Sequence, residues 1–487
     1  MRVVIKVPKS SGSNNCQQMK SPLFFSSLAI ILGLASSLHA ATTDRPPNLI
    51  VILTDDQGYG DVGFHGCKDI PTPNLDSIAS NGVHFPNGYV SYSVCSPSRA
   101  GMLTGRYEQR FGHERNPAWQ PDNPKSGLPL SETLLPAVLG KVGYASGAIG
   151  KWHLGAYPHF RPQPRGFTEF FGFLGGGHRY FADELTLKDT QEAKSGNEGE
   201  SYKLWVLRND TPVRTTNYLT EEFSDEAVRF VERHQHEPFF LYLAYNAPHG
   251  PLQATEKYLS RFPNITDPKR RTYAAMVSAV DDGVGQLMAK LRELNLETNT
   301  LIFYLSDNGG PTQDNASSNR PLRGAKGSPW EGGIRVPFAA QWPGHIPKGL
   351  VYEQPVISLD IFSTIAALAD APVDSARPLD GVNLMPYLTG QKSGPPHDAI
   401  YLRMYDKGAY AVRSGDYKLV ILNKDSGTKL FNLRQDLGES MNIAADRPEK
   451  LKDLDAKRTQ WDAQLIPPVF DGLVMKNVGS KNGSPQD

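Results

Sequence analysis

Four side chains with oxygen donors stand in two adjacent pairs, Asp55-Asp56 and Asp307-Asn308, and each pair directly follows an apolar run. Carboxylate and amide oxygens are the ligands that Ca²⁺ and Mg²⁺ prefer, and no cluster of cysteines and histidines accompanies them as zinc would require. Such pairs are also common in turns and caps, so one pair alone indicates little. Their shared position after two apolar runs predicts a site for one hard cation, either Ca²⁺ or Mg²⁺.

Cationic and imidazole side chains follow other segments of the same kind. Lys151 and His153 are two positions apart, so they share one face of an extended segment. His249 follows a proline, and Lys326 lies in the glycine-flanked loop 323–327. Each of them alone is more often a surface or capping residue. If they converge, they form a site that neutralises an anionic group and exchanges protons with it.

Cys95 opens the segment Cys95-Ser96-Pro97-Ser98-Arg99. Pro97 suits the first turn of a helix, which places Cys95 near a helix N-terminus, where a thiolate or another anion is stabilised. The alternatives are a buried structural cysteine and a disulfide with Cys67, which lies 28 positions earlier. From the residues alone, Cys95 is either a buried cysteine or a reactive one near a helix N-terminus.

The elements that must position these groups alternate along the chain. Apolar runs rich in β-branched and aromatic residues predict buried parallel strands, and amphipathic segments between them predict helices. We expect a mostly parallel sheet covered by helices on both faces, with a ligand site beyond the carboxyl ends of its strands. The predicted strands are 48–53, 144–149, 239–245 and 300–305, and the predicted helices are 74–80, 131–141, 221–235, 270–294 and 360–368.

The texture of the sequence changes after about residue 376. Short strand-like runs at 409–413, 417–422 and 429–433, followed by a helical segment at 448–465, predict a small antiparallel sheet with a terminal helix. We therefore expect a catalytic α/β domain over 45–375, a C-terminal α+β subdomain over 376–470 and a flexible tail over 471–487.

The first 41 residues have the features of an export leader. An apolar stretch from Leu23 to Leu34 precedes small residues that end at Ala40-Ala41, which predicts a secretory signal peptide and a secreted or periplasmic protein. The stretch is short for a bilayer span, so no stable membrane insertion is expected. Lys plus Arg equals Asp plus Glu, at 51 each, so no net field gathers nucleic acid.

Seven ordered motifs resemble one known family. The segment from Cys95 to Arg106 is similar to the signature of type I, formylglycine-dependent sulfatases, and Gly150-Lys151-Trp152-His153-Leu154-Gly155 is similar to their second signature. The remaining motifs match in the same order, so that the resemblance covers roughly residues 46–465: Asn48 to Gly63, Ala247 to His249, Ser306 to Gly309, Arg323 to Lys326, and a tail from Val412 to Asn442. The resemblance implies an alkaline-phosphatase-like α/β fold with a small C-terminal subdomain.

The resemblance also implies a role for each candidate. A maturation enzyme oxidises Cys95 to formylglycine (3-oxoalanine), and its hydrate is the nucleophile. In the implied site, Ca²⁺ is held by Asp55, Asp56, Asp307, Asn308 and residue 95, while Arg99 supports the hydroxyls of that residue. Lys151 and Lys326 neutralise the sulfate oxygens, His249 protonates the leaving alcohol, and His153 deprotonates the spare hydroxyl so that sulfate leaves.

The motifs look most like those of bacterial polysaccharide sulfatases that act on marine galactans such as carrageenan. The implied partner is a sulfated glycan, and the residues expected to contact it are His113, Arg115, Trp119, His178 and Arg179. Tryptophan stacks on sugar faces, and the glycines at 175–177 allow a close approach of the backbone. Three alternatives remain at this point: a glycosaminoglycan sulfatase, a phosphodiesterase or phosphonate monoester hydrolase of the same superfamily, and a non-catalytic glycan-binding protein.

Overall fold

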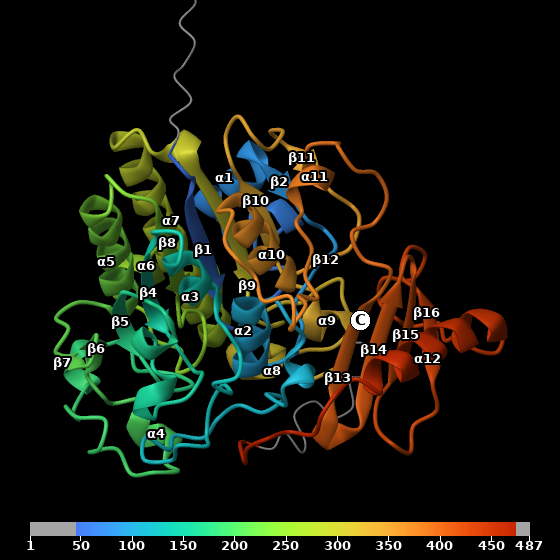
Figure 1. Ribbon diagram of the computed structural model, residues 1–487. Coiled ribbons are helices and arrows are strands. Elements are labelled where there is room, and N and C mark those ends of the chain that lie inside the picture. Colours follow the sequence, from blue (N-terminus) through green and yellow to red (C-terminus); the bar gives the residue numbers. More distant parts are fainter. Residues whose placement is uncertain (1–44, 474–487) are drawn as a thin grey trace, which may run out of the picture. The chain divides into compact units, whose positions relative to one another are not determined.

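The computed structural model describes residues 45–473, so the expected signal peptide within residues 1–41 lies outside the described part. Within that part, no helix is both long and apolar enough to cross a membrane. Two sheets carry the architecture, a large one built mostly from the first three quarters of the chain and a small one near its end (Figure 1).

The large sheet has ten strands in the described residues, and its centre is parallel. The order is β11-β2-β10-β9-β1-β8-β4-β5-β6-β7. Strands β9, β1, β8, β4 and β5 run parallel, whereas β10 is antiparallel to β9 and β6 is antiparallel to β5. The strands are β1 (Asn48–Thr54), β2 (Val83–His84), β4 (Ala145–Lys151), β5 (Glu169–Phe173), β6 (Val206–Arg208), β7 (Thr211–Val213), β8 (Phe239–Ala244), β9 (Thr300–Ser306), β10 (Phe338–Gln341) and β11 (Leu350–Val351).

Side chains of the central strands alternate between two cores. On β1, Leu49, Val51 and Leu53 enter one core, and Ile50 and Ile52 enter the other. Both faces of the sheet are therefore covered, as the continuous apolar runs predicted. The first core is closed by α2 (Cys95–Thr104), α3 (Leu135–Gly140) and α10 (Leu359–Leu368), and the second by α1 (Pro73–Asn81), α5 (Leu219–Arg233) and α7 (Pro268–Glu293).

The connections between these elements carry short pieces of structure. A two-stranded pair joins β3 (Gly88–Tyr89) to β12 (Val356–Ile357). Five of the helices have only four residues each: α4 (Glu198–Ser201), α6 (Glu256–Leu259), α8 (Thr312–Asn315), α9 (Glu331–Ile334) and α11 (Met385–Leu388). Helix α3 starts at Leu135 and not at Ser131 as expected, because Leu134 is extended and Pro136 stands in the first turn.

The small sheet is antiparallel, as the change of texture predicted. Its order is β13-β14-β15-β16, built from β13 (Ile400–Met404), β14 (Ala409–Ser414), β15 (Tyr417–Ile421) and β16 (Lys429–Asn432). Helix α12 (Pro448–Asp462) closes a small core through Leu454, which packs with Val412, Leu419 and Leu430. Strand β13, which the sequence analysis did not predict, pairs with β14 along its whole length. In Figure 1 this sheet and α12 lie at the right of the view, in dark orange and red.

Candidate active site

The end of β4 and the loop 323–327 bring two lysines against the two aspartates that follow β1. Lys151 is the last residue of β4, and its Nζ lies 2.6 Å from Oδ2 of Asp55. Lys326 Nζ lies 2.6 Å from Oδ1 of Asp56. Burial alone would lower the pKa of each lysine, but the neighbouring carboxylates and Cys95 outweigh it and raise both pKa values. Both lysines are therefore fixed positive charges at the same end of the sheet.

Cys95 is the first residue of α2 and lies inside this group of charges. Its Sγ is 3.1 Å from Lys326 Nζ and 3.5 Å from Asp55 Oδ1, and the residue is buried. The predicted position at a helix N-terminus is confirmed, but the expected stabilisation of a thiolate is wrong. Burial, followed by the charge of Asp55, raises the pKa of the thiol to about 12. Within the described residues Cys67 and Cys95 are both free, so the disulfide alternative fails as well.

Arg99 links α2, which begins with Cys95, to the residue that follows β9. It lies one turn after Cys95, and its Nε and Nη2 contact Oδ2 of Asp307 at 2.9 and 2.8 Å. Its Nη1 donates to the backbone oxygen of Lys151 at 3.1 Å. Since the guanidinium and the Asp307 carboxylate are both fully buried, the pair fixes α2 against two strand ends at once.

The donor set fits a hard cation. Ligand atoms of Asp55, Asp56, Cys95 and Asp307 all lie within 4.8 Å of one another. Asn308 Nδ2 donates to Asp56 Oδ1 at 2.7 Å, which leaves Asn308 Oδ1 buried with no protein partner. Three carboxylates beside an unpaired amide oxygen form a set that a divalent cation would complete.

The two carboxylates nearest the centre of the site differ in acidity. Burial, followed by the charge of Asp55, raises the pKa of Asp307 to about 6. Burial acts in the same direction on Asp55, but Lys151, His249, Arg99 and Lys326 together hold its pKa below the ordinary range. The cluster therefore stabilises Asp55 as an anion, whereas the negative charge of Asp307 is only partly compensated by its neighbours.

Two histidines face the same cluster. His249 Nδ1 lies 2.7 Å from the backbone oxygen of Gly250, and its Nε2 lies 3.6 Å from Asp56 Oδ2. His153 has a positive φ of 57° and is buried, and neither of its ring nitrogens has a protein partner. A Cβ at Gly176 would lie 2.9 Å from His153 Nε2, so this glycine makes room for the imidazole. Both rings therefore offer a nitrogen toward the charged groups.

Three of the residues expected to contact a glycan are buried in protein contacts. His113 Nε2 lies 2.7 Å from Ser96 Oγ, Trp119 Nε1 donates to the oxygen of Ala193 at 3.2 Å, and His178 Nδ1 lies 2.8 Å from the oxygen of Arg179. Trp119 is only 3% exposed. Contact of these three side chains with a glycan stays a prediction, because Lys151 and His153 of the candidate site are equally buried.

The two arginines expected to bind a glycan keep more exposure and remain candidates. Arg115 forms a two-point contact with Asp406 at 2.7 and 2.9 Å. Arg179 is 38% exposed at its side chain and lies 3.5 Å from Glu184. Both arginines already pair with a carboxylate, so a sulfate group would have to compete with that carboxylate for either of them.

A segment near the end of the described chain supports the loop that follows α2. Residues 466–473, here called the C-terminal strap, donate backbone hydrogen bonds to Gln109, Gly112 and Asn116. Asn116 Oδ1 accepts from the backbone N–H of Ser96 at 3.0 Å, and the Phe470 ring lies 5.0 Å from that of His113. The neighbour of Cys95 is thus held by a loop that the strap covers. The sequence motifs gave no signal for this, because the contacts join positions more than 350 residues apart.

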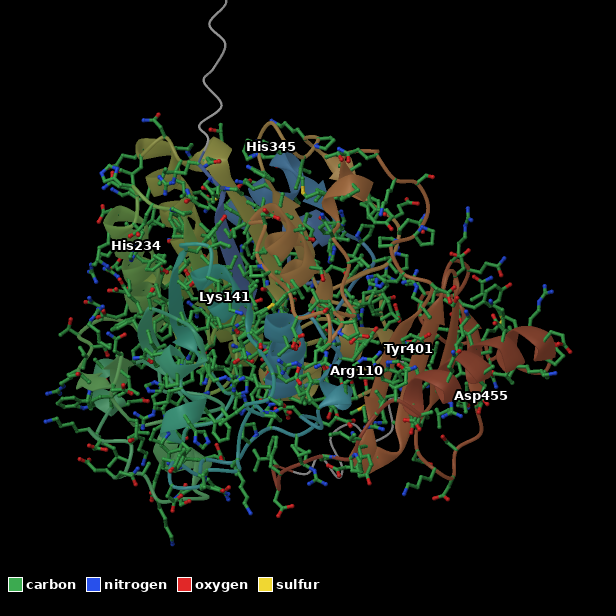
Figure 2. The ribbon with its side chains drawn as sticks, viewed as in Figure 1. Arg110, Lys141, His234, His345, Tyr401 and Asp455 are labelled. Atoms are coloured by element: carbon green, nitrogen blue, oxygen red, sulfur yellow. The ribbon has the colours of Figure 1, made fainter. Side chains whose placement is uncertain are left out.

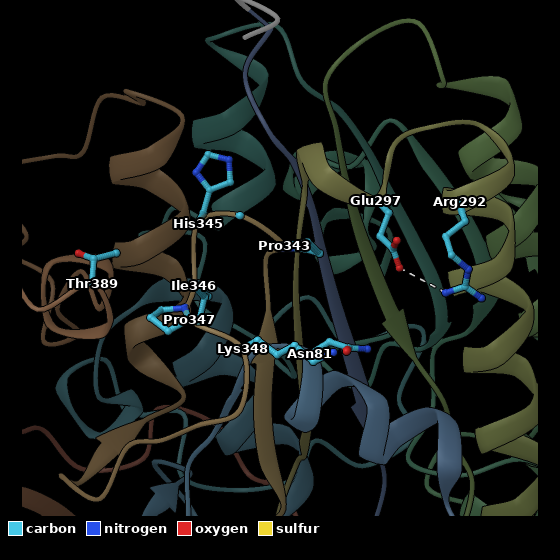
Figure 3. A pocket seen from close by; sticks show the side chains of 10 residues that line it. Asn81, Arg292, Glu297, Pro343, His345, Ile346, Pro347, Lys348 and Thr389 are labelled. Carbon is cyan, nitrogen blue, oxygen red and sulfur yellow. Dashed lines mark hydrogen bonds and ion pairs between the residues drawn. The ribbon is translucent and has the colours of Figure 1, made fainter. Parts of the chain in front are cut away.

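Two pockets of the described part lie away from the predicted site residues. One of about 840 Å³ lies between Asn81, Arg292, Glu297 and the turn 343–348, at the edge where β9 begins and therefore opposite the charged cluster (Figure 3). The other, of about 290 Å³, adjoins the small sheet where Arg110 and Tyr401 are labelled in Figure 2. None of the predicted catalytic, metal or glycan residues lines either pocket.

Comparison with known proteins agrees with the geometry. The sequence profile of the sulfatase family matches residues 47–371, and a profile described as N-sulphoglucosamine sulphohydrolase, C-terminal, matches residues 326–461. N-acetylgalactosamine-6-sulfatase of Homo sapiens is 37% identical over 361 residues, which cover 72% of this chain and 67% of the relative. Arylsulfatase A of Bos taurus is 33% identical over 477 residues, which cover 90% and 92%.

Solved structures give the same result. The crystal structure of Ps i-CgsB in complex with k-i-k-neocarrahexaose superposes with a TM-score of 0.82 at 39% identity, covering 88% of this chain and 95% of that one. PsFucS1 sulfatase from Pseudoalteromonas sp. has a TM-score of 0.74 at 26% identity and covers 88% and 92%. The expected fold class, a mostly parallel sheet between helices with a small antiparallel C-terminal sheet, is confirmed. On the family match and the identity to its relatives, the chain belongs to the sulfatase family and is a sulfuric ester hydrolase.

Proposed function

We propose that this enzyme removes sulfate from a sulfated galactan of the carrageenan type, with formylglycine at position 95 as the nucleophile and Ca²⁺ at the strand ends. The observation that carries the proposal is the convergence of Cys95, two lysines and three carboxylates at one end of the sheet. The choice of glycan is supported by the 39% identity to Ps i-CgsB, whose crystal structure contains a neocarrahexaose.

In the proposed reaction the two lysines receive the sulfate group. Lys151 and Lys326 carry fixed positive charge and lie on either side of position 95, with Lys326 Nζ 3.1 Å from Sγ. Charges held in a water-poor site cost no reorganisation when negative charge develops on the sulfuryl oxygens. The lysines would therefore bind the sulfate and lower the barrier to its transfer.

The histidines handle the protons in this proposal. The Nδ1 of His249 is occupied by the backbone oxygen of Gly250, so Nε2 is the atom that would protonate the departing alcohol. His153, with both nitrogens free of protein partners, would accept a proton from the hydroxyl group of residue 95 that did not attack. The two imidazoles thus divide the acid and base roles.

Two groups absent from the chain as synthesised complete the proposed site. The hydrated aldehyde at position 95 would supply two hydroxyl groups, one to attack sulfur and one to expel sulfate, and a maturation enzyme would have to produce it. Asp55, Asp56, Asp307 and Asn308 would hold Ca²⁺, which supplies a Lewis acid for the sulfate oxygens. Arg99 would position the hydroxyls of residue 95 while it anchors Asp307.

A glycosaminoglycan is the second candidate substrate. It is supported by the 37% identity to N-acetylgalactosamine-6-sulfatase of Homo sapiens. The similarity to a phosphonate monoester hydrolase of Silicibacter pomeroyi, at 18% identity, concerns the fold alone.

The test is sulfate release from a panel of purified carrageenan and glycosaminoglycan oligosaccharides. The protein is produced together with a formylglycine-generating enzyme, and the oxidation state of residue 95 is read by mass spectrometry. An aryl sulfate and a phosphodiester serve as controls. Release from carrageenan oligosaccharides alone supports the proposal, and release from glycosaminoglycans alone replaces its substrate. Cleavage of the phosphodiester without any sulfate release, in protein with oxidised residue 95, contradicts the proposal.

A further inference from the structure

One exposed aromatic side chain, Tyr405, directly follows Met404, which contacts the segment that leads into Cys95. Tyr405 begins the short helical turn Tyr405–Lys407 after β13 and is 42% exposed. Among the large apolar and aromatic side chains that are strongly exposed within residues 45–473, it is the one aromatic ring. Single exposed apolar side chains are common on protein surfaces, so any role of this ring depends on where it lies.

Two tethers place this turn beside the catalytic loops. Ser93 Oγ lies 3.6 Å from Sδ of Met404, so the end of β13 packs against the segment that leads into Cys95. Lys407 Nζ donates to the backbone oxygen of Gly327 at 2.6 Å. Gly327 itself donates to the oxygen of Ser93 at 2.7 Å and directly follows Lys326. The turn that carries Tyr405 therefore lies against the loop that carries Lys326.

The backbone of Tyr405 and the neighbouring Arg403 are both fixed by Glu114, and the charged groups near the ring already have partners. The backbone N–H of Tyr405 donates to Glu114 Oε2 at 3.2 Å, and the Arg403 guanidinium lies 5.5 Å from the ring centroid. Arg403 is fixed in turn by the buried Glu114 at 2.6 Å. Beside the turn, Arg115 is paired with Asp406. A rigid ring without a free cation suits the apolar face of a neutral sugar better than a second sulfate group.

We propose that Tyr405 is a stacking platform for a pyranose ring of the glycan chain next to the sugar that carries the reacting sulfate. This inference rests on the proposed function and adds a binding residue to it. Beside the predicted contact of Trp119, which is buried, it places an aromatic ring contributed by the C-terminal sheet.

The test compares Tyr405→Ala, Tyr405→Phe and a matched control, Tyr387→Ala on α11, in the matured full-length enzyme. The measured quantity is the ratio of kcat/KM for a carrageenan hexasaccharide to kcat/KM for para-nitrophenyl sulfate, which has no neighbouring sugar. Tyr405→Ala is expected to lower this ratio about tenfold through KM, whereas Tyr405→Phe keeps it within about twofold because the ring remains. Tyr387→Ala leaves the ratio unchanged.

The outcomes separate this inference from the proposed function. An unchanged ratio in Tyr405→Ala, or an equal loss on both substrates, overturns the platform while hexasaccharide turnover by the wild type upholds the proposed function. If the wild type cleaves para-nitrophenyl sulfate and not the hexasaccharide, the carrageenan assignment fails. The ratio is then measured with the panel oligosaccharide that the wild type does cleave, and the same tenfold criterion decides on Tyr405.

Discussion

Two buried clusters of charge lie in this molecule, and they differ in what they leave unpaired. The active-site cluster comprises Asp55, Asp56, Arg99, Lys151, Asp307 and Lys326 around Cys95. The junction cluster lies between α9 and the small sheet and comprises Glu331, Arg335, Arg413, Lys418 and Glu439. Both bury several charges, so burial of charge by itself does not mark the site of chemistry.

The junction cluster is a closed set of contacts. Lys418 Nζ lies 2.8 Å from both Glu331 and Glu439, and Glu331 also accepts from Tyr89. Burial raises the pKa of Glu439 to about 7, while Lys418 and the neighbouring arginines outweigh burial and lower that of Glu331 to about 2. One lysine is thus shared by an ionised and a more easily protonated carboxylate, and no ligand is required.

The active-site cluster instead leaves acceptors open. Asn308 Oδ1 and both nitrogens of His153 have no protein partner, although they are buried. Unpaired buried polar atoms cost free energy and persist where a ligand or a reaction uses them. The clusters differ in their counter-charges: Lys418 lies 2.8 Å from both junction carboxylates, whereas three carboxylates and an unpaired amide oxygen of the candidate active site would be completed by a divalent cation.

The largest expected effect is the loss of activity when Cys95 in the candidate active site is replaced. Cys95→Ser should lower multiple-turnover sulfate release by about a thousandfold or more, because serine cannot provide the second hydroxyl that expels sulfate. The melting temperature should stay near the wild-type value, since the side chains are similar in size. Steady-state assays with calorimetric melting curves check this, and sustained turnover by the serine variant would contradict the formylglycine mechanism.

The opposite pattern is expected at the junction cluster. Lys418→Met leaves Glu331 and Glu439 facing each other without their cation, which should destabilise the fold by about 3–5 kcal/mol. Urea unfolding followed by circular dichroism measures the change. Lys450→Met, which removes an exposed pair with Asp453, is the control and should leave the unfolding midpoint in place. A midpoint for Lys418→Met equal to that of the control would show that the cluster adds no stability.

Calcium should stabilise the active-site cluster and not the junction. Millimolar Ca²⁺ added after chelation should raise Tm by about 3 °C or more, because it binds the folded state and relieves the repulsion among three carboxylates. Asn308→Leu removes the unpaired amide oxygen and should reduce the shift. An identical shift in the variant would place the cation elsewhere, and no shift in the wild type would argue against a Ca²⁺ site.

The smallest effect concerns a third buried pair, in which each charge has one partner. His397 Nε2 lies 2.7 Å from Asp360 Oδ1, and burial, which would lower its pKa, is outweighed by Asp360, so the pKa is raised. The folded state then binds more protons than the unfolded state around and above pH about 6.5. The pair's stabilisation is therefore full below that pH and declines as the pH rises through the raised value. Melting curves of wild type and His397→Asn should differ most at acidic pH and converge at alkaline pH. A difference that grows with pH would contradict the assignment.

The sequence was sufficient to predict the central sheet and the residues at its strand ends. The runs that became β1, β8 and β9 are apolar along their whole length, and the polar residues that follow them necessarily meet at one edge. Strand β13 was missed although it carries Met404 and leads to Tyr405, because its alternation is weak and its pairing is with β14. The antiparallel β10 was also missed, because its four residues are all buried and show no alternation.

Side-chain exposure was the less predictable property. Trp119 and His113 have the residue types of a sugar site, but Ala193, Ser96 and the strap enclose them. Exposure depends on which distant segments pack against a loop, and that information is not present in local spacing. The Lys418 contacts belong to the same class, since they join β15 to α9.

The position of the C-terminal strap in the sequence bears on when residue 95 becomes buried during folding. Its residues are synthesised last among those described, yet they cover the loop that fixes Ser96 beside a fully buried Cys95. Under the proposed mechanism, a maturation enzyme would therefore have to oxidise residue 95 before this part of the chain folds, because Cys95 is only 1% exposed in the folded protein.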